Sequence, residues 1–227
     1  MFTGLVQAMG NIVSVRRLEK GVHIEIDADE LAPRNIEIGE SIAVNGVCLT
    51  ATAVAGRRFG ADVSHETLSR TNGLDGCGPV NLETSLAFGD KLGGHLVAGH
   101  VDAVGTVVCC TPIGESVELV VHAPWALARF LAPKGSVAVD GVSLTINRVS
   151  DRPAGGGTGA RGPDAAADTA SAGCEMSINL IPHTVASTTL KRLAAGSRVN
   201  LEVDLIARYV ERMLHGTGSA QGSPAPP

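Results

Sequence analysis

The sequence contains two copies of one unit, and this repeat limits the possible folds more than any other feature. Residues 41–50 are SIAVNGVCLT and residues 136–145 are SVAVDGVSLT, an offset of 95 (136 − 41), with seven of ten positions identical. The same offset aligns Gly4 with Gly99 and Ala8 with Ala103. Further along the offset grows to 119, where VNLE of residues 80–83 meets VNLE of residues 199–202. The repeat predicts two similar folding units of roughly 100 residues each.

The growing offset locates extra residues in the second copy. Residues 151–174 hold 15 Gly, Ala or Pro among 24 and lack Leu, Ile, Val, Phe and Met. Such a segment buries too little apolar surface to offset the entropy of ordering it, so we expect a flexible surface insertion. Its Gly157, Gly159 and Gly162 match G-x-G-x-x-G, but the flanking strand and helix that a dinucleotide site needs are not indicated.

Short apolar or alternating runs in both copies are typical of β-strands. They lie at 10–15, 22–26, 41–47 and 80–86 in the first copy, and at 105–110, 116–122, 136–146, 175–181 and 199–205 in the second. Short helices are expected at 65–71, 124–132 and 183–191. No long amphipathic helix separates the strands, which disfavours a parallel α/β sheet. The pattern favours two small antiparallel barrels, because closure removes exposed edges.

Composition and charge exclude several classes of protein. With 44% hydrophobic and 18% charged residues the chain has enough apolar material for packed cores. The net charge of -5 disfavours a nucleic-acid-binding surface. No apolar run approaches the roughly 20 residues of a membrane span, and MFTGLVQAMG does not resemble a secretion signal. Five cysteines without a C-x-x-C pair suit reduced thiols in the cytoplasm.

The end of the chain has a helical pattern. Leu205, Ile206, Tyr209, Val210, Met213 and Leu214 form one apolar stripe within residues 204–215. Two interpretations stay open, that the stripe docks onto its own barrel or that it packs against sister chains. Residues 216–227, which include GTGSAQGSPAPP, are expected to be a disordered tail.

The polar residues that recur in the repeat are small. Cys48 and Thr50 in the first copy correspond to Ser143 and Thr145 in the second. Residues two apart in a strand point to the same side, so each pair presents two hydrogen-bonding groups on one face. At a barrel mouth such groups would suit a neutral polyhydroxylated heterocycle better than a phosphate or a metal. The alternative is that the hydroxyls satisfy backbone groups.

Histidines near the junction of the two copies are candidates for proton transfer. His100 can exchange protons near neutral pH. His95 and His100 lack an obvious third ligand nearby, which disfavours a metal site. Glu66 and His183 occupy corresponding places at the start of predicted helices, where capping is the simplest role.

These motifs together resemble the alpha-type riboflavin synthase family. The resemblance rests on MFTGLV, SIAVNGVCLT, GGHLVAGHVD, KGSVAVDGVSLT and LIPHTVASTTL, in this order from Met1 to about residue 215. It implies an all-β chain of two tandem six-stranded antiparallel Greek-key barrels and a C-terminal helix. The domains would span 1–96 and 97–203, with the insertion 151–174 in the second, followed by an oligomerisation helix at 204–215.

The resemblance also implies a reaction. Enzymes of this family take two molecules of 6,7-dimethyl-8-ribityllumazine and transfer a four-carbon unit between them, giving riboflavin and 5-amino-6-ribitylaminouracil. No metal or redox cofactor takes part. The expected assembly is a homotrimer in which the first barrel of one subunit faces the second barrel of a neighbour. An association with lumazine synthase is a further implied partner.

Site residues follow from the resemblance, motif by motif. Phe2 would lie near the reacting rings. The first pocket would contain Gly4, Leu5, Val6, Cys48, Leu49, Thr50, Asp62, Val63, Ser64, His65, Glu66 and Thr67. The second would contain Gly99, His100, Val101, Lys134, Ser143, Leu144, Thr145, Asn179, Leu180, Ile181, Pro182, His183 and Thr184.

The expected mechanism depends mostly on positioning. His100 is the leading candidate for proton transfer, while Ser143 and Thr145 would bind one ring system and Cys48 and Thr50 the other. Lys134 completes the catalytic set. A thiolate role for Cys48 would need electropositive surroundings that the sequence does not indicate. The competing hypothesis is a non-catalytic antenna protein that binds a lumazine or flavin without converting it.

Overall fold

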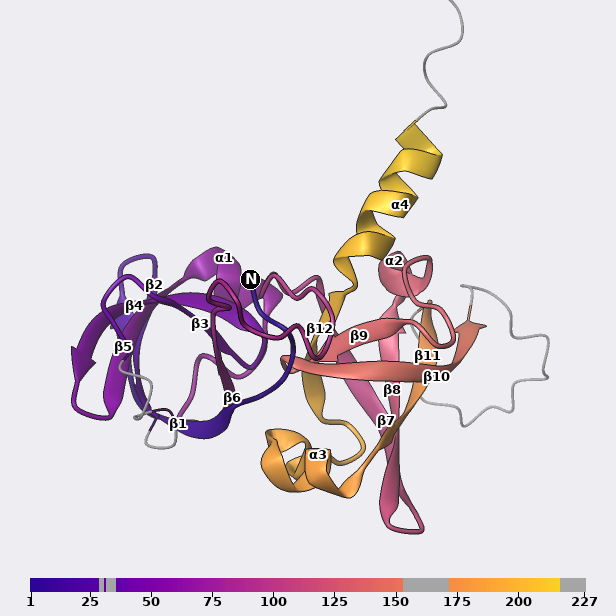
Figure 1. The fold of residues 1–227 in the computed structure, drawn as a ribbon, viewed down its shortest axis with the longest axis horizontal. Helices are drawn as coiled ribbons and strands as arrows, with labels where there is room; N and C mark the ends of the chain where they lie inside the picture. Colours follow the sequence, from indigo (N-terminus) through magenta and orange to yellow (C-terminus); the bar gives the residue numbers. More distant parts are fainter. Residues whose placement is uncertain (29–30, 32–35, 153–171, 217–227) are drawn as a thin grey trace, which may run out of the picture.

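The computed structural model describes residues 1–28, 31, 36–152 and 172–216, and they form two closed antiparallel barrels. The first barrel has the strand order β1-β2-β5-β4-β3-β6 (Figure 1). Its strands are β1 (Ala8–Leu18), β2 (Gly21–Asp27), β3 (Ser41–Val44), β4 (Val47–Ala55), β5 (Arg58–Ser64) and β6 (Gly78–Thr84), and α1 (His65–Arg70) follows β5.

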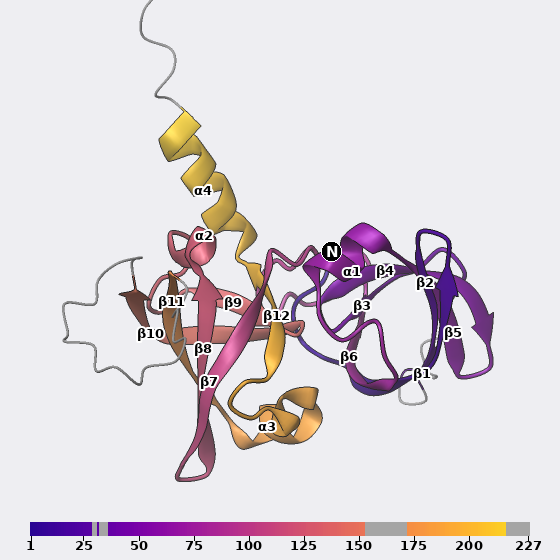
Figure 2. The same cartoon turned by 180° about the vertical axis from the view of Figure 1, so that it is seen from behind.

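The second barrel has the order β10-β11-β8-β7-β12-β9 (Figure 2). Its strands are β7 (Ala103–Ile113), β8 (Ser116–Pro124), β9 (Ser136–Val139), β10 (Val142–Arg152), β11 (Gly173–Leu180) and β12 (Arg198–Val203). The short helices are α2 (Trp125–Ala128), α3 (Pro182–Ser187) and the 3-10 helix η2 (Thr189–Arg192). The predicted all-β class, with two six-stranded barrels and a C-terminal helix, is therefore confirmed.

Each barrel has its own apolar core, built from the alternating residues of its strands. Ile24, Phe59 and Leu82 are among the buried residues of the first core, and Leu119, Met176 and Leu201 are among those of the second. Strand positions correspond at the repeat offset, since β1 and β7 begin at Ala8 and Ala103. The sequence repeat is thus a repeat of a complete barrel.

Two details differ from the sequence-based expectations. The runs at 41–47 and 136–146 each contain a hairpin rather than one strand. Asn45 and Gly46 have positive φ angles (47° and 79°), as do Asp140 and Gly141 (46° and 79°), the geometry of a tight two-residue turn. The predicted insertion is also too long at both ends. Asp151 pairs with Cys174 and Arg152 with Gly173, in β10 and β11. Low-complexity composition gave no sign of these pairs, and Cys174 is fully buried in the second core.

The middle of the insertion (153–171) and the expected tail from residue 217 on lie outside the described residues. The last helix, α4 (Leu205–Gly216), projects from the second barrel (Figure 1). No helix within the described ranges is long and apolar enough to cross a membrane.

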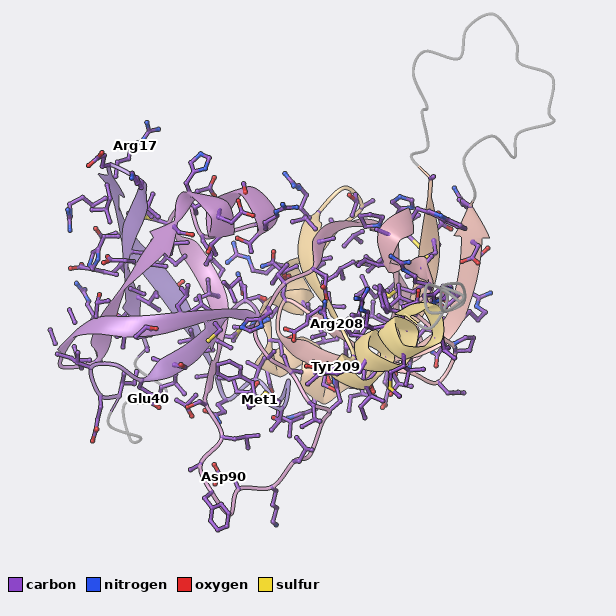
Figure 3. All side chains as sticks on the ribbon, turned by 90° about the horizontal axis from the view of Figure 1, so that it is seen from above. Met1, Arg17, Glu40, Asp90, Arg208 and Tyr209 are labelled. Atoms are coloured by element: carbon purple, nitrogen blue, oxygen red, sulfur yellow. The ribbon has the colours of Figure 1, made fainter. Side chains whose placement is uncertain are left out.

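Helix α4 is fixed by polar rather than apolar contacts. Arg208 donates to both carboxylate oxygens of Asp102 at 2.8 Å, and Arg129 pairs with Glu211 at 3.2 Å. Figure 3 shows Arg208 and Tyr209 on this helix where it lies over the second barrel. The apolar stripe stays exposed at Ile206, Tyr209, Val210, Met213 and Leu214. Docking of the stripe onto its own barrel was therefore the wrong alternative.

The barrels lie side by side and meet around an approximate two-fold axis. Phe2 and Val97, which are partners in the repeat, exchange backbone hydrogen bonds of 2.7 and 3.1 Å. A side chain on Gly46 would collide with the backbone of Gly141, and the reverse also holds. Residues that contact their own repeat partner lie on the axis, as at an isologous interface.

Candidate functional site

The predicted small polar pairs lie on the outer walls of the barrels. Along β4, Leu49 points into the first core while Cys48 and Thr50 lie on the opposite, outward face. Along β10, Leu144 is buried between Ser143 and Thr145 in the same way. Each pair shares one face as predicted, but that face is the outside of the wall and not the barrel mouth, since packed side chains fill the interior.

The short segment that precedes the first strand of each barrel in the sequence crosses to the other barrel. We call Phe2–Val6 and Val97–Val101 the leading segments. The Ser143 amide donates to the Gly4 carbonyl at 2.7 Å, and the Cys48 amide donates to the Gly99 carbonyl at 2.8 Å. The grouping that the resemblance implied, Gly4 with Cys48 and Gly99 with Ser143, differs from these contacts, because each glycine bonds the wall of the other barrel.

Apolar contacts show the same exchange. Val6 packs against the core of the second barrel, and Val101 packs against the core of the first. The physical reason lies in the two-fold axis. Because Phe2 pairs with Val97 on the axis, the residues that follow each of them diverge onto opposite barrels.

Glycine is required at both crossing points. Gly4 and Gly99 have φ angles of 74° and 79°, a left-handed conformation that side chains disfavour. A Cβ on Gly4 would lie 2.6 Å from the Ser143 Cβ, and one on Gly99 would lie 2.6 Å from the Cys48 Cβ. The leading segments thus approach the walls as closely as a backbone can.

The first candidate region, the Cys48 half-site, consists of Cys48, Thr50, residues 62–67 and the leading segment 97–101. Asp62 and Ser64 are exposed on β5, and Asp62 lies 2.6 Å from His23 Nδ1. His100 is exposed directly after Gly99. Within the described residues the Thr50 hydroxyl bonds no backbone group, so it remains available to a ligand.

Helix α1 closes one end of the Cys48 half-site. Ser64 caps it by accepting the Thr67 amide at 3.1 Å. Glu66 instead pairs with Arg70 at 3.0 Å, and His183 lies inside α3, which has no side-chain cap. The capping role considered for Glu66 and His183 was therefore wrong. Both side chains are exposed.

The second candidate region, the Ser143 half-site, consists of Ser143, Thr145, Lys134, residues 179–184 and the leading segment 2–6. Its Ser143 hydroxyl lies 2.7 Å from His95 Nδ1. His95 is 8% exposed, and its Nε2 has no hydrogen-bond partner among the described residues. Burial lowers the pKa of His95, an effect that the charge of Asp204 opposes. The ring is therefore a neutral partner of the hydroxyl at neutral pH.

Lys134 stands at a strained backbone position beside β10. Its φ angle is 69°, and its amide donates to the Ile146 carbonyl at 2.7 Å. The first copy has Gly39 (φ 94°) at this position, with its amide bonded to Ala51. A side chain at a left-handed position costs on the order of 1 kcal/mol, and such strain is concentrated at functional sites.

Several residues expected in the site are buried. Leu49, Val63, Leu144 and Leu180 belong to the two cores, so only their backbone groups can reach a ligand. Phe2 is fully buried between the barrels with Ala43, Val97 and Ala138. Leu5 and Ile181 are exposed, together with Asn179, Pro182, His183 and His65, while Thr67 and Thr184 are half-buried.

Comparison with known proteins agrees with this architecture. The family model of the lumazine binding domain matches twice, over residues 3–85 and 98–204. A riboflavin synthase of Mycobacterium tuberculosis is 41% identical over 223 residues, which cover 96% of this chain and 100% of that protein. The chain belongs to the riboflavin synthase family. A further member, from Photobacterium phosphoreum, is 38% identical over 94% of this chain and 89% of its own.

Solved structures share the fold of this riboflavin synthase family member. The structure of LumP complexed with riboflavin has a TM-score of 0.72 at 24% identity, and it covers 89% of this chain and 99% of that one. LumP complexed with 6,7-dimethyl-8-(1'-D-ribityl) lumazine has a TM-score of 0.71 over the same shares. At this identity the likeness concerns the arrangement of the barrels.

Sequence reasoning missed two residues of this riboflavin synthase family member. The sequence suggests His95 only as a metal ligand, although it contacts Ser143, and it gives no sign of His23, which contacts Asp62. The repeat could have drawn attention to His23, since it aligns with Glu118 and both lie opposite a site position, Asp62 and Asn179. The offset of 95 gives His95 no counterpart, so no pattern singled it out.

Proposed function

We propose that this chain is a riboflavin synthase. It converts two molecules of 6,7-dimethyl-8-ribityllumazine into riboflavin and 5-amino-6-ribitylaminouracil, and the four carbons lost by one molecule are gained by the other. The observation that carries the proposal is the presence of two half-sites of one design in a single chain. Two similar half-sites suit a reaction between two identical molecules. The names of the relatives, at 38–41% identity over nearly the whole chain, support the same activity.

In the proposed sites, short polar side chains hold the two ring systems. Ser143 and Thr145, with Lys134 and residues 179–184, bind one molecule, and Cys48 and Thr50, with residues 62–67, bind the other. His100 transfers protons at the Cys48 half-site. The contact between His95 and Ser143 adds a histidine to the other half-site.

Little strongly activated chemistry is needed in this mechanism. The C7 methyl group of the substrate is acidic because its carbanion delocalises into the heterocycle. Holding two such rings face to face supplies on the order of 7–11 kcal/mol of the barrier in favourable cases. The exposed polar walls suit this mechanism, because they can hold each ring system through many contacts that are individually weak.

A second subunit is part of the proposal. Both half-sites are open walls. Two cavities lie elsewhere, one of 350 Å³ lined by Trp125 and Arg129 and one of 320 Å³ lined by Asn72 and Arg192, and no proposed site residue lines either of them. A neighbouring barrel would enclose the walls, and the exposed stripe of α4 offers a surface for subunit contact. We therefore propose a homotrimer in the cytoplasm, with domains 1–96 and 97–203, and an association with lumazine synthase on the resemblance alone.

The antenna alternative is not favoured. Such a protein needs one bound chromophore, whereas both walls here keep a pair of small polar groups. The relatives that match over nearly the full chain are named as synthases.

The test is direct. Purified protein is incubated with 6,7-dimethyl-8-ribityllumazine as the sole substrate, and riboflavin is followed by its absorbance and by chromatography. We expect one riboflavin for every two molecules consumed. Ser143→Ala should lower the rate at least about tenfold, and Ser150→Ala, an exposed serine of the same strand, should not change it. Binding of the substrate without riboflavin formation would favour the antenna protein.

A further inference from the structure

Two buried glutamates occupy equivalent places in the last strand of each barrel. Glu83 in β6 and Glu202 in β12 are the final residues of the repeated VNLE motif, and each is 4% exposed. Burial raises the pKa of both carboxyls. A carboxylate is rarely kept in such a place unless hydrogen bonds compensate for the loss of water.

Glu83 holds the first leading segment. Its Oε1 accepts the Thr3 amide and the Thr3 hydroxyl, both at 2.7 Å, and its Oε2 accepts the Gly4 amide at 3.0 Å. The carbonyl of the same Gly4 then accepts the Ser143 amide in the other barrel. A side chain of the first barrel therefore fixes a segment of the second half-site.

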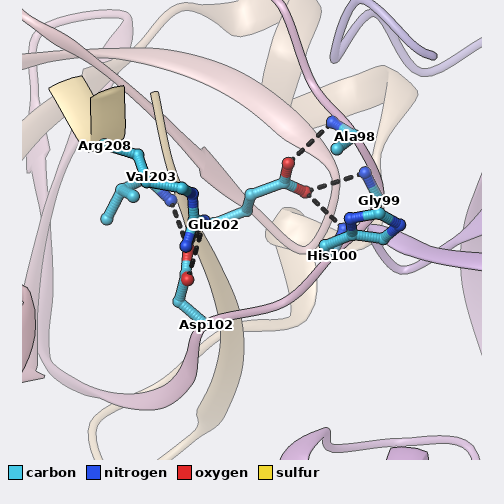
Figure 4. Close-up of polar contacts among 7 residues, drawn as sticks. All are labelled: Ala98, Gly99, His100, Asp102, Glu202, Val203 and Arg208. Atoms are coloured by element: carbon cyan, nitrogen blue, oxygen red, sulfur yellow. Dashed lines mark hydrogen bonds and ion pairs between the residues drawn. The ribbon is translucent and has the colours of Figure 1, made fainter. Parts of the chain in front are cut away.

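Glu202 holds the second leading segment in the same way (Figure 4). Its Oε1 accepts the Ala98 amide at 2.6 Å, and its Oε2 accepts the amides of Gly99 and His100, both at 3.0 Å. The Gly99 carbonyl accepts the Cys48 amide in the first barrel. The neighbouring Asp102 accepts the Val203 amide and the Arg208 guanidinium, so this segment is tied to β12 and α4 as well.

We propose that each glutamate is a positioning residue for the half-site of the opposite barrel. Glu83 orders the segment that completes the Ser143 half-site, and Glu202 orders the segment that completes the Cys48 half-site and carries His100. This positioning role rests on the proposed function, because the half-sites are those of the synthase. Its physical basis is independent of activity, since three charge-assisted hydrogen bonds hold each segment against a wall that leaves no room for a Cβ.

Hydrogen exchange in the full-length, ligand-free protein tests the crossing pattern. Glu83→Gln keeps the shape of the side chain but turns one acceptor into a donor that faces the bound amides. We expect exchange at the Ser143 amide to accelerate about tenfold and exchange at the Cys48 amide to stay unchanged. Glu202→Gln is the matched variant and should accelerate exchange at Cys48 alone. Equal acceleration at both amides, or acceleration within the barrel that carries the substitution, would overturn the proposal.

A milder variant keeps the test valid if Glu83→Gln does not fold. Thr3→Ala removes one of the three contacts of Glu83 and installs the residue that the second copy carries at the equivalent position, Ala98. It should accelerate exchange at Ser143 by about threefold. Unchanged exchange at Ser143 in this variant contradicts the proposed role of Glu83.

Measurements of turnover then test whether the crossed positioning of the leading segments matters for the reaction. In double-mutant cycles of kcat/KM, Glu83→Gln should couple to Ser143→Ala by at least about threefold and be additive with Cys48→Ala, and Glu202→Gln should show the opposite preference. A wild-type chain that fails to convert the lumazine refutes the proposed function and leaves the exchange pattern standing. A normal rate with the wrong exchange pattern refutes only this inference.

Discussion

The two half-sites share a backbone design and differ in the side chains that the design presents. The crossing carbonyls of Gly4 and Gly99 meet the amides of Ser143 and Cys48 at nearly equal distances, 2.7 and 2.8 Å. The residues after these glycines are Leu5 in one half-site and His100 in the other. The backbone bonds are therefore the same in both copies, whereas the outward-facing groups differ and give the proposed reaction two unlike places.

Polar residues between the barrels also keep the same backbone hydrogen bonds in both copies while their side chains differ. The Asn45 side chain accepts the Asn81 amide at 2.8 Å, and Asp140 accepts the Asn200 amide at 2.7 Å. An amide thus stands where the other copy has an acid. Burial raises the pKa of Asp140 to about 7. The same hydrogen bond is therefore accepted by a neutral amide, Asn45, in the first copy and by a carboxyl that titrates, Asp140, in the second.

Adding a methyl group at the crossing glycines should have the largest effect on the stability of the two half-sites. Gly4→Ala and Gly99→Ala each place a Cβ 2.6 Å from the Cβ of the opposing wall residue, at a positive φ angle. Overpacking and backbone strain together predict a loss of about 3 kcal/mol or more in the free energy of unfolding. Urea unfolding followed by circular dichroism measures it. Gly39→Ala is the control, since a Cβ there meets nothing within 4 Å, and it should cost only about 1 kcal/mol.

Replacing Asp140 by asparagine gives the second copy the residue of the first. The folded-state pKa of Asp140 is raised from 3.8 to about 7, so its contribution to stability is complete below about pH 4 and is lost as the pH rises through about 7. Asp140→Asn keeps the acceptor for Asn200 and removes the charge. We expect it to raise the free energy of unfolding by on the order of 2 kcal/mol at about pH 8, with the gain vanishing toward about pH 4.

Denaturant unfolding of both proteins across that pH range measures the effect. Asn45→Asp is the mirror variant and should introduce a loss of stability that grows with pH. A constant difference between Asp140→Asn and the wild type at every pH would contradict the assignment of the pH dependence to Asp140.

The histidine of the Ser143 half-site is the next point of comparison. His95→Leu leaves the Ser143 hydroxyl without its partner at 2.7 Å, so we expect kcat/KM for the lumazine to fall about tenfold. His95→Asn places a polar atom near the position of Nδ1 and should recover most of the activity. Stability should fall little in His95→Leu, because the unpartnered Nε2 is removed as well.

A background that lacks the serine hydroxyl provides the control. In Ser143→Ala, His95→Leu should have no further effect on kcat/KM, since the residue acts through that hydroxyl. An equal additional loss in that background would show that His95 acts on the substrate or the fold by another route.

Much of the fold was predictable from local patterns. Alternation predicted that Cys48 and Thr50 share one face, and the repeat offsets made β1 equivalent to β7 and β6 equivalent to β12. Leu49, which was expected in the first pocket, points into the core instead. Strand β5 was not predicted, because RFGADVS mixes charged and small residues and its alternation is weak. Its buried members, Phe59, Ala61 and Val63, acquire meaning only from the barrel around them.

The exchange of the leading segments could not be predicted from the repeat. An offset shows which residues are equivalent and does not show whether Gly4 contacts its own copy or the other one, because both arrangements give the same sequence. The choice is made by the pairing of Phe2 with Val97 on the two-fold axis and by the carboxylates of Glu83 and Glu202. All of these contacts join residues that are roughly 80 or more positions apart, beyond the reach of periodicity arguments.

The smallest expected effect concerns the strained lysine. Lys134 takes a left-handed conformation where the first copy has Gly39, so Lys134→Gly should relieve strain and leave the free energy of unfolding unchanged or higher by about 0.5 kcal/mol. If the strain is retained for the proposed reaction, the same variant should raise KM for the lumazine several-fold while the protein stays fully folded. Gly39→Lys is the reciprocal change and should cost about 1 kcal/mol without restoring activity, because it places the amine beside the other wall. Normal kinetics in Lys134→Gly would show that the Lys134 side chain has no part in the reaction. The turns at Lys134 and Gly39 would then differ only in backbone strain.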